Sequence, residues 1–177
     1  MRNIIAAALF SFCALAQAQP IEFKGVQMGA SVSDLRNGMG DWFSFSCAGD
    51  EAGAQSCLID GFTYANEKVV RAVAQFDAGR LASVTVVLEA GPFDAVAAAL
   101  RSKYGAPKVD RKSVGKNAYG AAFPQREIAW YPREGGAIWA SLQAQKVNEA
   151  TVVLMSPEAL AASAGAAAKK PAAKKDL

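Results

Sequence analysis

The sequence offers few side chains that could carry out chemistry, because none of its 177 residues is a histidine. Histidine is the commonest general base, a frequent zinc and copper ligand, and the partner of serine or cysteine in common nucleophile pairs. Ser102 and Lys103 are adjacent, so on a helix they would point to different parts of the surface, and no supporting motif accompanies them. We therefore expect no enzyme, with no catalytic residue, metal ligand or cofactor; a histidine-free hydrolase is the remaining enzymatic alternative.

The three cysteines indicate a structural disulfide. Cys13 lies in an N-terminal segment that we expect to be removed, which leaves Cys47 and Cys57. An even pair of cysteines in an exported chain is most simply a disulfide. A redox-active pair would need a closer spacing, such as C-x-x-C, and a lowered thiol pKa. We predict that Cys47 and Cys57 are bonded to each other.

A basic stretch over residues 101–126 is the first candidate binding region. Its seven lysines and arginines face one acidic residue, Asp110, and aromatic residues lie among them. The candidate binding residues are Lys108, Arg111, Lys112, Lys116, Tyr119 and Arg126. Such a stretch could dock on an acidic protein surface, an anionic glycan or lipid phosphates. The alternative is a solvated loop beside a helix end that favours cations.

Trp130 and Trp139 are the second candidate for binding. They belong to a set of aromatic residues completed by Trp42, Phe43, Phe45 and Tyr131. If helices cover one side of a sheet, some of these residues must lie on its other face, where tryptophan and tyrosine often anchor protein interfaces. The alternative is that they fill the core or cap the sheet edge.

Residues 69–107 form the unit that must position these side chains. Residues 70–76 alternate in the manner of a strand, residues 77–79 suit a tight turn, and residues 81–88 are rich in β-branched side chains. After Gly91 and Pro92, one apolar helical stripe is formed by Phe93, Val96, Ala97, Leu100 and Tyr104. We predict a β-hairpin followed by an amphipathic helix that ends at Gly105.

The flanking segments predict a second helix and further strands. Ser31 and Asp34 have the spacing of a capping box, which would start a short helix toward Met39. Residues 42–47, 57–65, 127–131, 137–145 and 151–155 are predicted strands, whereas residues 108–126 lack periodicity and are predicted as loop. Because strands follow each helix without a βαβ rhythm, the expected fold class is α+β: an antiparallel β-sheet with two helices packed on one face. The element order also suggests an αβββ pseudo-repeat.

The ends of the chain predict export. Residues 1–18 have the pattern of a signal peptide, with Arg2, an apolar run that is too short for a bilayer span, and an A-Q-A site ending at Ala18. We expect cleavage after Ala18, a periplasmic location and no integral membrane span. Residues 19–160 would form a single α+β domain. Residues 161–177 are rich in alanine and lysine and are predicted to be a disordered tail.

The net charge of the expected domain is close to zero. The formal charge of the whole sequence is +3, but Arg2 and the four lysines of residues 169–175 belong to the expected leader and tail. Without these and Asp176, 14 basic and 15 acidic residues remain of the 19 and 16 in the sequence. A nucleic-acid partner is therefore not expected, because such domains carry a strongly basic surface.

Three segments resemble known proteins: FKGVQMGASVSDL, AQFDAGRLASVTV and DAVAAALRSKYGAP. They are similar to small uncharacterised proteins of the bacterial periplasm. The element order resembles the β-lactamase-inhibitor-protein-like fold, shared by small outer-membrane-assembly lipoproteins of the SmpA/OmlA type. The resemblance implies helices on one face of an antiparallel sheet and binding of other proteins, but no contact residue. This sequence lacks the lipoprotein cysteine, and only its first half could hold a disulfide.

Together these patterns predict a secreted periplasmic binding domain that engages a protein partner in the cell envelope. The alternative is a weak binder of anionic envelope glycan or lipid, through residues 101–126 and the lysine-rich tail.

Overall fold

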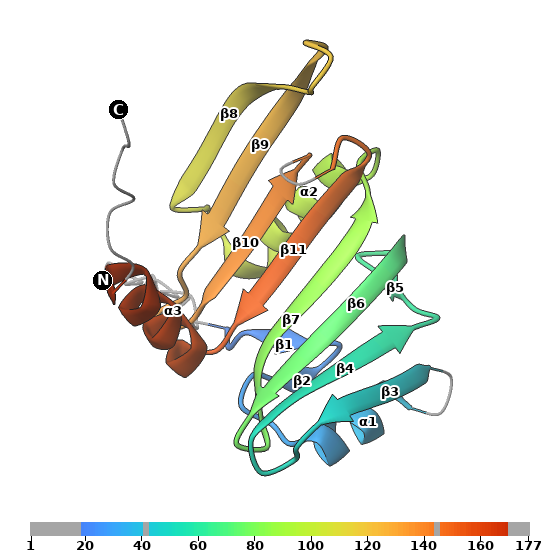
Figure 1. Cartoon of the computed structure of the whole chain (residues 1–177), viewed down its shortest axis with the longest axis vertical. Helices are drawn as coiled ribbons and strands as arrows, with labels where there is room; N and C mark the ends of the chain where they lie inside the picture. The colour runs from blue at the N-terminus through green and yellow to red at the C-terminus, as the bar shows by residue number, and fades with distance from the viewer. Residues whose placement is uncertain (1–18, 41–42, 144–145, 170–177) are drawn as a thin grey trace, which may run out of the picture.

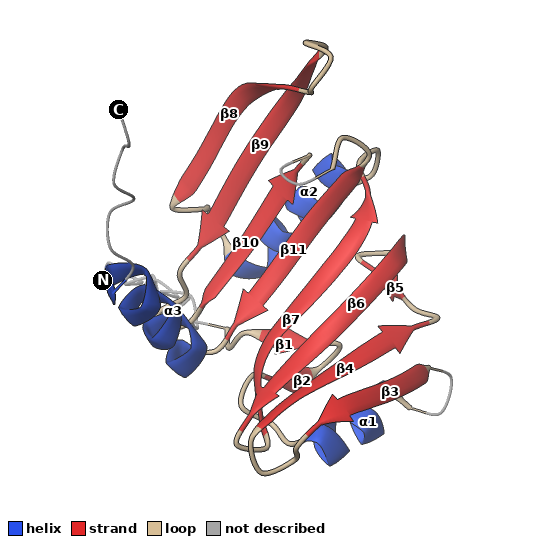
Figure 2. Ribbon diagram, in the orientation of Figure 1, coloured by secondary structure: helices blue, strands red, loops and turns tan. Residues whose placement is uncertain are grey.

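The computed structural model describes residues 19–40, 43–143 and 146–169. The predicted signal peptide, its cleavage site, Trp42 and residues 170–177 lie outside this part of the chain. Within it, a nine-stranded antiparallel β-sheet is accompanied by three helices and a separate two-stranded sheet (Figures 1 and 2). The predicted α+β class with an antiparallel sheet is confirmed. No helix in the described residues is long and apolar enough to cross a bilayer.

The elements of the first half are β1 (Glu22–Phe23), β2 (Val26–Gln27), α1 (Val32–Met39), β3 (Ser44–Gly49), β4 (Ala54–Asp60), β5 (Thr63–Tyr64), β6 (Glu67–Asp77) and β7 (Arg80–Glu89). Those of the second half are α2 (Phe93–Tyr104), β8 (Val109–Lys116), β9 (Ala122–Trp130), β10 (Ala137–Leu142), β11 (Glu149–Met155) and α3 (Pro157–Lys169).

The order of strands in the large sheet is β3-β4-β6-β7-β11-β10-β9-β8, with the short β5 paired to β6 off this path. Strands β3, β4, β6 and β7 form one antiparallel meander, and β8 to β11 form another. The two meanders meet where β7 pairs with β11. Each edge of the sheet is therefore a hairpin, β3–β4 at one end and β8–β9 at the other.

The predicted central unit is confirmed as β6, β7 and α2. Ala78 and Gly79 both have positive φ, at 47° and 73°, which suits the two-residue turn of a β-hairpin. The apolar stripe of α2 is buried at Phe93, Val96, Ala97 and Leu100. At the C-terminus of this helix Gly105 has a φ of 79°, which a residue with a side chain rarely adopts.

One core cluster joins the two halves of the chain. It includes alternate residues of the central strands together with Leu35 and Met39 of α1 and the buried stripe of α2. Helix α1 begins at the predicted capping box, in which the Asp34 amide donates to Ser31 Oγ over 3.1 Å and the Ser31 amide donates to Asp34 Oδ2 over 3.0 Å. The Ser31 hydroxyl, which donates to Asp34 Oδ2 over 2.7 Å, and the Ser31 amide both favour the ionised carboxylate, so the pKa of Asp34 lies below its ordinary value.

The predicted disulfide between Cys47 and Cys57 is confirmed. The two cysteines lie directly opposite each other in the β3–β4 ladder, with their Cα atoms 4.0 Å apart. Because β3 runs to Gly49 and β4 begins at Ala54, the intervening loop is shorter than the sequence indicated, and the disulfide joins two paired strands.

The prediction of a loop over residues 108–126 was wrong. This segment forms β8 and the first half of β9, which pair from Val109↔Ala129 to Lys116↔Ala122. Strand β8 is an edge strand, and nearly all of its residues are exposed. A strand exposed on both faces has no apolar alternation, so periodicity could not reveal it.

The tail predicted to be disordered over residues 161–177 is helical over its first residues. Helix α3 spans Pro157–Lys169 and begins where the Ala159 amide donates to Ser156 Oγ over 3.1 Å. Alanine has the highest helix propensity of the amino acids, so an alanine-rich segment can be helical even though it buries little surface.

Candidate functional site

A continuous row of mostly apolar side chains crosses the whole large sheet on the face opposite the core. We call it the cross-strand row. It is built from registered neighbours on eight strands: Ser46, Leu58, Val73, Thr85, Val153, Trp139, Ala129 and Val109. The solvent face of a one-sided antiparallel sheet is ordinarily polar, so this row needs an explanation other than the core.

The row is accessible over much of its length. Leu58 is 43% exposed and Val109 is 41% exposed, near the two ends of the row, whereas Trp139 and its neighbour Val153 are half-buried. Trp139 Nε1 donates a hydrogen bond to the hydroxyl of exposed Tyr131 over 3.3 Å. The row thus presents an aromatic pair with polar atoms at its edge, as anchors in protein interfaces do.

Polar residues flank the cross-strand row on both sides. The neighbouring row on one side includes Arg71 and Arg111, which form ion pairs with Glu149 and Glu127. The row on the other side includes Gln75 and buried Ser83, whose hydroxyl donates to Gln75 Oε1 over 3.3 Å. An apolar centre with a polar border is the anatomy of a protein–protein interface.

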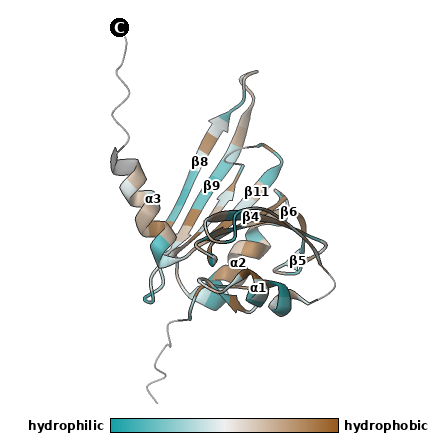
Figure 3. Cartoon of the chain, turned by 60° about the horizontal axis from the view of Figure 1, so that its bottom comes forward, coloured by the Kyte–Doolittle hydropathy of each residue, from teal (hydrophilic) through white to brown (hydrophobic). Residues whose placement is uncertain are grey.

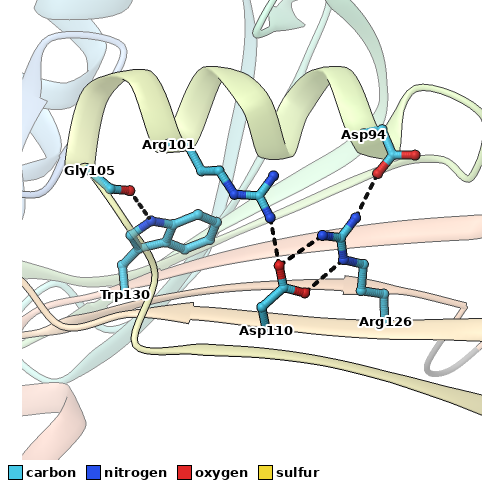
Figure 4. Close-up of polar contacts among 6 residues, drawn as sticks. All are labelled: Asp94, Arg101, Gly105, Asp110, Arg126 and Trp130. Atoms are coloured by element: carbon cyan, nitrogen blue, oxygen red, sulfur yellow. Dashed lines mark hydrogen bonds and ion pairs between the residues drawn. The ribbon is translucent and has the colours of Figure 1, made fainter.

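The two candidate tryptophans lie on opposite faces of the sheet. Trp130 is 2% exposed and belongs to the core, opposite Ile138 of β10. Its Nε1 donates to the carbonyl of Gly105 over 3.0 Å, which ties β9 to the end of α2 (Figure 4). Trp130 is therefore unavailable as a surface contact and matches the alternative that it fills the core. Trp139 remains a surface candidate.

Two arginines of the basic stretch, Arg101 and Arg126, form an ion-pair network between α2 and the β8–β9 hairpin (Figure 4). Arg126 donates from Nε and Nη2 to the two carboxylate oxygens of Asp110, both over 2.8 Å, and from Nη1 to Asp94 over 2.9 Å. Arg101 donates to Asp110 over 2.7 Å. The Arg126 hydrogen bonds hold the pKa of Asp110 below its ordinary value, and Asp110 raises the pKa of Arg126.

The positive charge of the stretch is consequently smaller than the sequence indicated. Arg111 pairs with Glu127 on the other face of the hairpin, and Lys103 pairs with Glu22. Asp94 and Glu127 lie outside residues 101–126 and reach the stretch only through the fold, so the sequence alone does not reveal them. Within the described residues, three exposed cations of the stretch make no ion pair: Lys108, Lys112 and Lys116.

One further groove and the acidic and cysteine side chains of the described residues show no recognisable chemistry. A groove of about 770 Å³ lies between the β2–α1 link, the β6–β7 turn and the start of α3, and contains none of the candidate residues. Its lining includes Met28, Ala78 and Pro157. The described part of the chain holds no cluster of three or more potential metal-ligating side chains.

No family model matches the chain, and comparison with curated proteins and with solved structures finds no significant match.

Proposed function

We propose that this chain is a non-enzymatic binding domain of the cell envelope, and that the face of the sheet bearing the cross-strand row binds a protein partner. The single observation that carries this proposal is the unbroken row through all eight registered strands. Neighbouring strands lie about 4.8 Å apart, so the row is roughly 30 Å long. That length suits a standard interface of about 800 Å² on each partner.

The chemistry of the face indicates what the partner must offer. Arg71 and Arg111 are already paired within the domain, so the face has little net charge to attract an acidic surface. The complementary surface is therefore apolar along the cross-strand row, where it would cover Trp139 and Leu58, and polar along the flanking rows. Burial of these two side chains would supply the largest part of the binding free energy.

The disulfide supports placement of this domain in an oxidising compartment such as the periplasm, because disulfides form and persist there. We also infer that the fold contains an internal repeat of one helix and four strands, one strand more than the sequence suggested. In support, a four-strand meander follows each of α1 and α2, and both helices lie on the same side of the sheet in Figure 3. We also propose that the fold is of the β-lactamase-inhibitor-protein-like type, which its element order resembles.

Crosslinking inside the intact envelope tests the proposal. The wild type is expected to form a discrete crosslinked complex, which Leu58→Asp abolishes because the charge would be desolvated against an apolar surface. The matched control is Ala98→Asp, at an exposed position on α2. Both variants must retain the circular dichroism spectrum of the wild type. Equal loss in both variants, or no complex with the wild type, would refute a partner at this face.

A further inference from the structure

The β8–β9 hairpin extends beyond the rest of the sheet. Pairing of β9 with β10 ends at Arg126↔Leu142, whereas pairing of β9 with β8 continues to Lys116↔Ala122. Residues 113–125 therefore form a two-stranded projection, which we call the arm (Figure 1). A two-stranded hairpin without a third strand or a helix to cover it is marginally stable in water. The arm therefore needs a source of stability other than the sheet.

The tip of the arm is a closed turn. Asn117 Oδ1 accepts hydrogen bonds from the amides of Tyr119 and Ala121, over 3.0 and 2.9 Å, and the Asn117 amide donates to the Ala121 carbonyl over 3.0 Å. Below the turn, a Cβ atom on Gly115 would lie 2.7 Å from the ring of Phe123, so this ring packs directly on the backbone of β8. The shape of the arm is thus set before any ligand binds.

The arm carries an aromatic side chain at its tip and exposed lysines behind it. At the tip, Tyr119 is 96% exposed. Toward the sheet follow Lys116, then Val114, which is 71% exposed, and then Lys112 at the base of the arm. Residues 113–125 contain no acidic side chain. The carboxylate of Asp110 lies only at the base, where Arg126 and Arg101 bind it.

We propose that the arm docks on the surface of an anionic lipid bilayer. Tyrosine is enriched at the boundary between headgroups and hydrocarbon, so Tyr119 at the tip would enter this boundary. Lys116 would then lie at the level of the lipid phosphates, with Lys112 farther out. A lysine near an anionic membrane surface strengthens binding by about fivefold.

The order of side chains favours a bilayer over the other anionic ligands. A soluble glycan held by the lysines would leave Tyr119 at the tip exposed. A bilayer covers the apolar tip and neutralises the lysines behind it in one arrangement. This surface is separate from the cross-strand row, so the two proposals succeed or fail independently.

Sedimentation with vesicles tests the inference. The purified protein is mixed with vesicles of phosphatidylglycerol and phosphatidylcholine in equal parts, or of phosphatidylcholine alone. We expect binding to the mixed vesicles that weakens with salt, and much weaker binding to the neutral ones. Lys116→Glu should reduce the partition coefficient by about 25-fold, because it removes an attraction and adds a repulsion of similar size. Tyr119→Ser should also reduce it.

Matched controls separate docking from non-specific attraction. Lys68→Glu makes the same change of charge at an exposed lysine of β6, and Tyr131→Ser removes an exposed tyrosine elsewhere. Both controls should bind the mixed vesicles nearly as the wild type does. The inference is overturned if the wild type does not bind, or if Lys68→Glu weakens binding as much as Lys116→Glu. Retention on dextran sulfate without any effect of Tyr119→Ser on vesicle binding would indicate a polyanion site instead.

Discussion

The two edge hairpins of the sheet occupy equivalent places in the strand order but are fastened by different means. Hairpin β3–β4 is held by the Cys47–Cys57 disulfide. Hairpin β8–β9 has no such bond, and Arg126 and Trp130 attach it to helix α2. A covalent link between neighbouring strands is insensitive to pH and salt, whereas a partly exposed ion-pair network is sensitive to both. The comparison indicates that the attachment of the second edge, which carries the arm, depends on pH and salt, whereas that of the first edge does not.

The largest expected effect comes from removal of the tryptophan that anchors the second edge. Trp130→Ala should lower the free energy of unfolding by about 3–5 kcal/mol, since it deletes a fully buried aromatic side chain. Trp139→Ala deletes the same side chain from the opposite face, where it is half-buried, and should cost about 1–2 kcal/mol. Chemical denaturation measures both. Similar losses would show that our assignment of the two faces is wrong.

Removal of the disulfide should affect the first edge alone. Replacement of both cysteines by serine should cost about 2–3 kcal/mol in the loop-entropy model, because the bonded residues are 10 positions apart. Amide exchange in β3 and β4 should become faster, and exchange in β8 and β9 should stay as in the wild type. A reducing agent should reproduce this change in the wild type and do nothing to the variant. Loss of protection in both hairpins would mean that the edges are not fastened independently.

Disruption of the ion-pair network should affect the second edge alone. Arg126→Met should lower the free energy of unfolding by about 1–2 kcal/mol, since the arginine is 17% exposed and its loss leaves two carboxylates without a shared cation. Arg111→Met removes a far more exposed arginine from the same hairpin and should cost less than about 1 kcal/mol. High salt should reduce the difference in the free energy of unfolding between Arg126→Met and the wild type. A larger loss for Arg111→Met would contradict the assigned network.

Acid should loosen the second edge by a smaller amount. The pKa of Asp110 is lower in the folded protein than in the unfolded chain, so its contribution to stability is complete above the ordinary aspartate value of about 3.9. The contribution is lost as the pH falls from that value through the folded pKa, because the unfolded chain takes up the proton first. Amide exchange in β8, corrected for intrinsic rates, should therefore show weaker protection in acid. Asp110→Asn should remove this part of the pH dependence; greater protection of β8 in acid would reverse the sign that we assign.

The sequence was informative wherever burial produced a pattern. Alternation in β6 and the apolar stripe of α2 both report a buried face, and the capping box at Ser31 is a local signal. Strand β8 has no buried face, so it was mistaken for a loop. Helix α3 was missed because its composition resembled that of a disordered tail.

The candidate site was harder to predict because it depends on register. Trp130 and Trp139 are both strand residues, and only the pairing of β9 with β10 shows that one faces the core and the other faces outward. The sequence overstated the positive charge of the basic stretch, because folding brings Asp94 and Glu127 into ion pairs with its arginines. The cross-strand row draws one residue from each of eight strands and has no signature in the linear sequence.

The most direct test of the central claim is photo-crosslinking from both ends of the cross-strand row in the intact envelope. A photoreactive residue is placed at Leu58 or at Val109, which lie roughly 30 Å apart on one face, or at Ala98 of α2 as a control. We predict that Leu58 and Val109 yield adducts with the same protein and that Ala98 yields none with it. Adducts with unrelated proteins at the two ends, or the same adduct from Ala98, would contradict a single partner bound across this face.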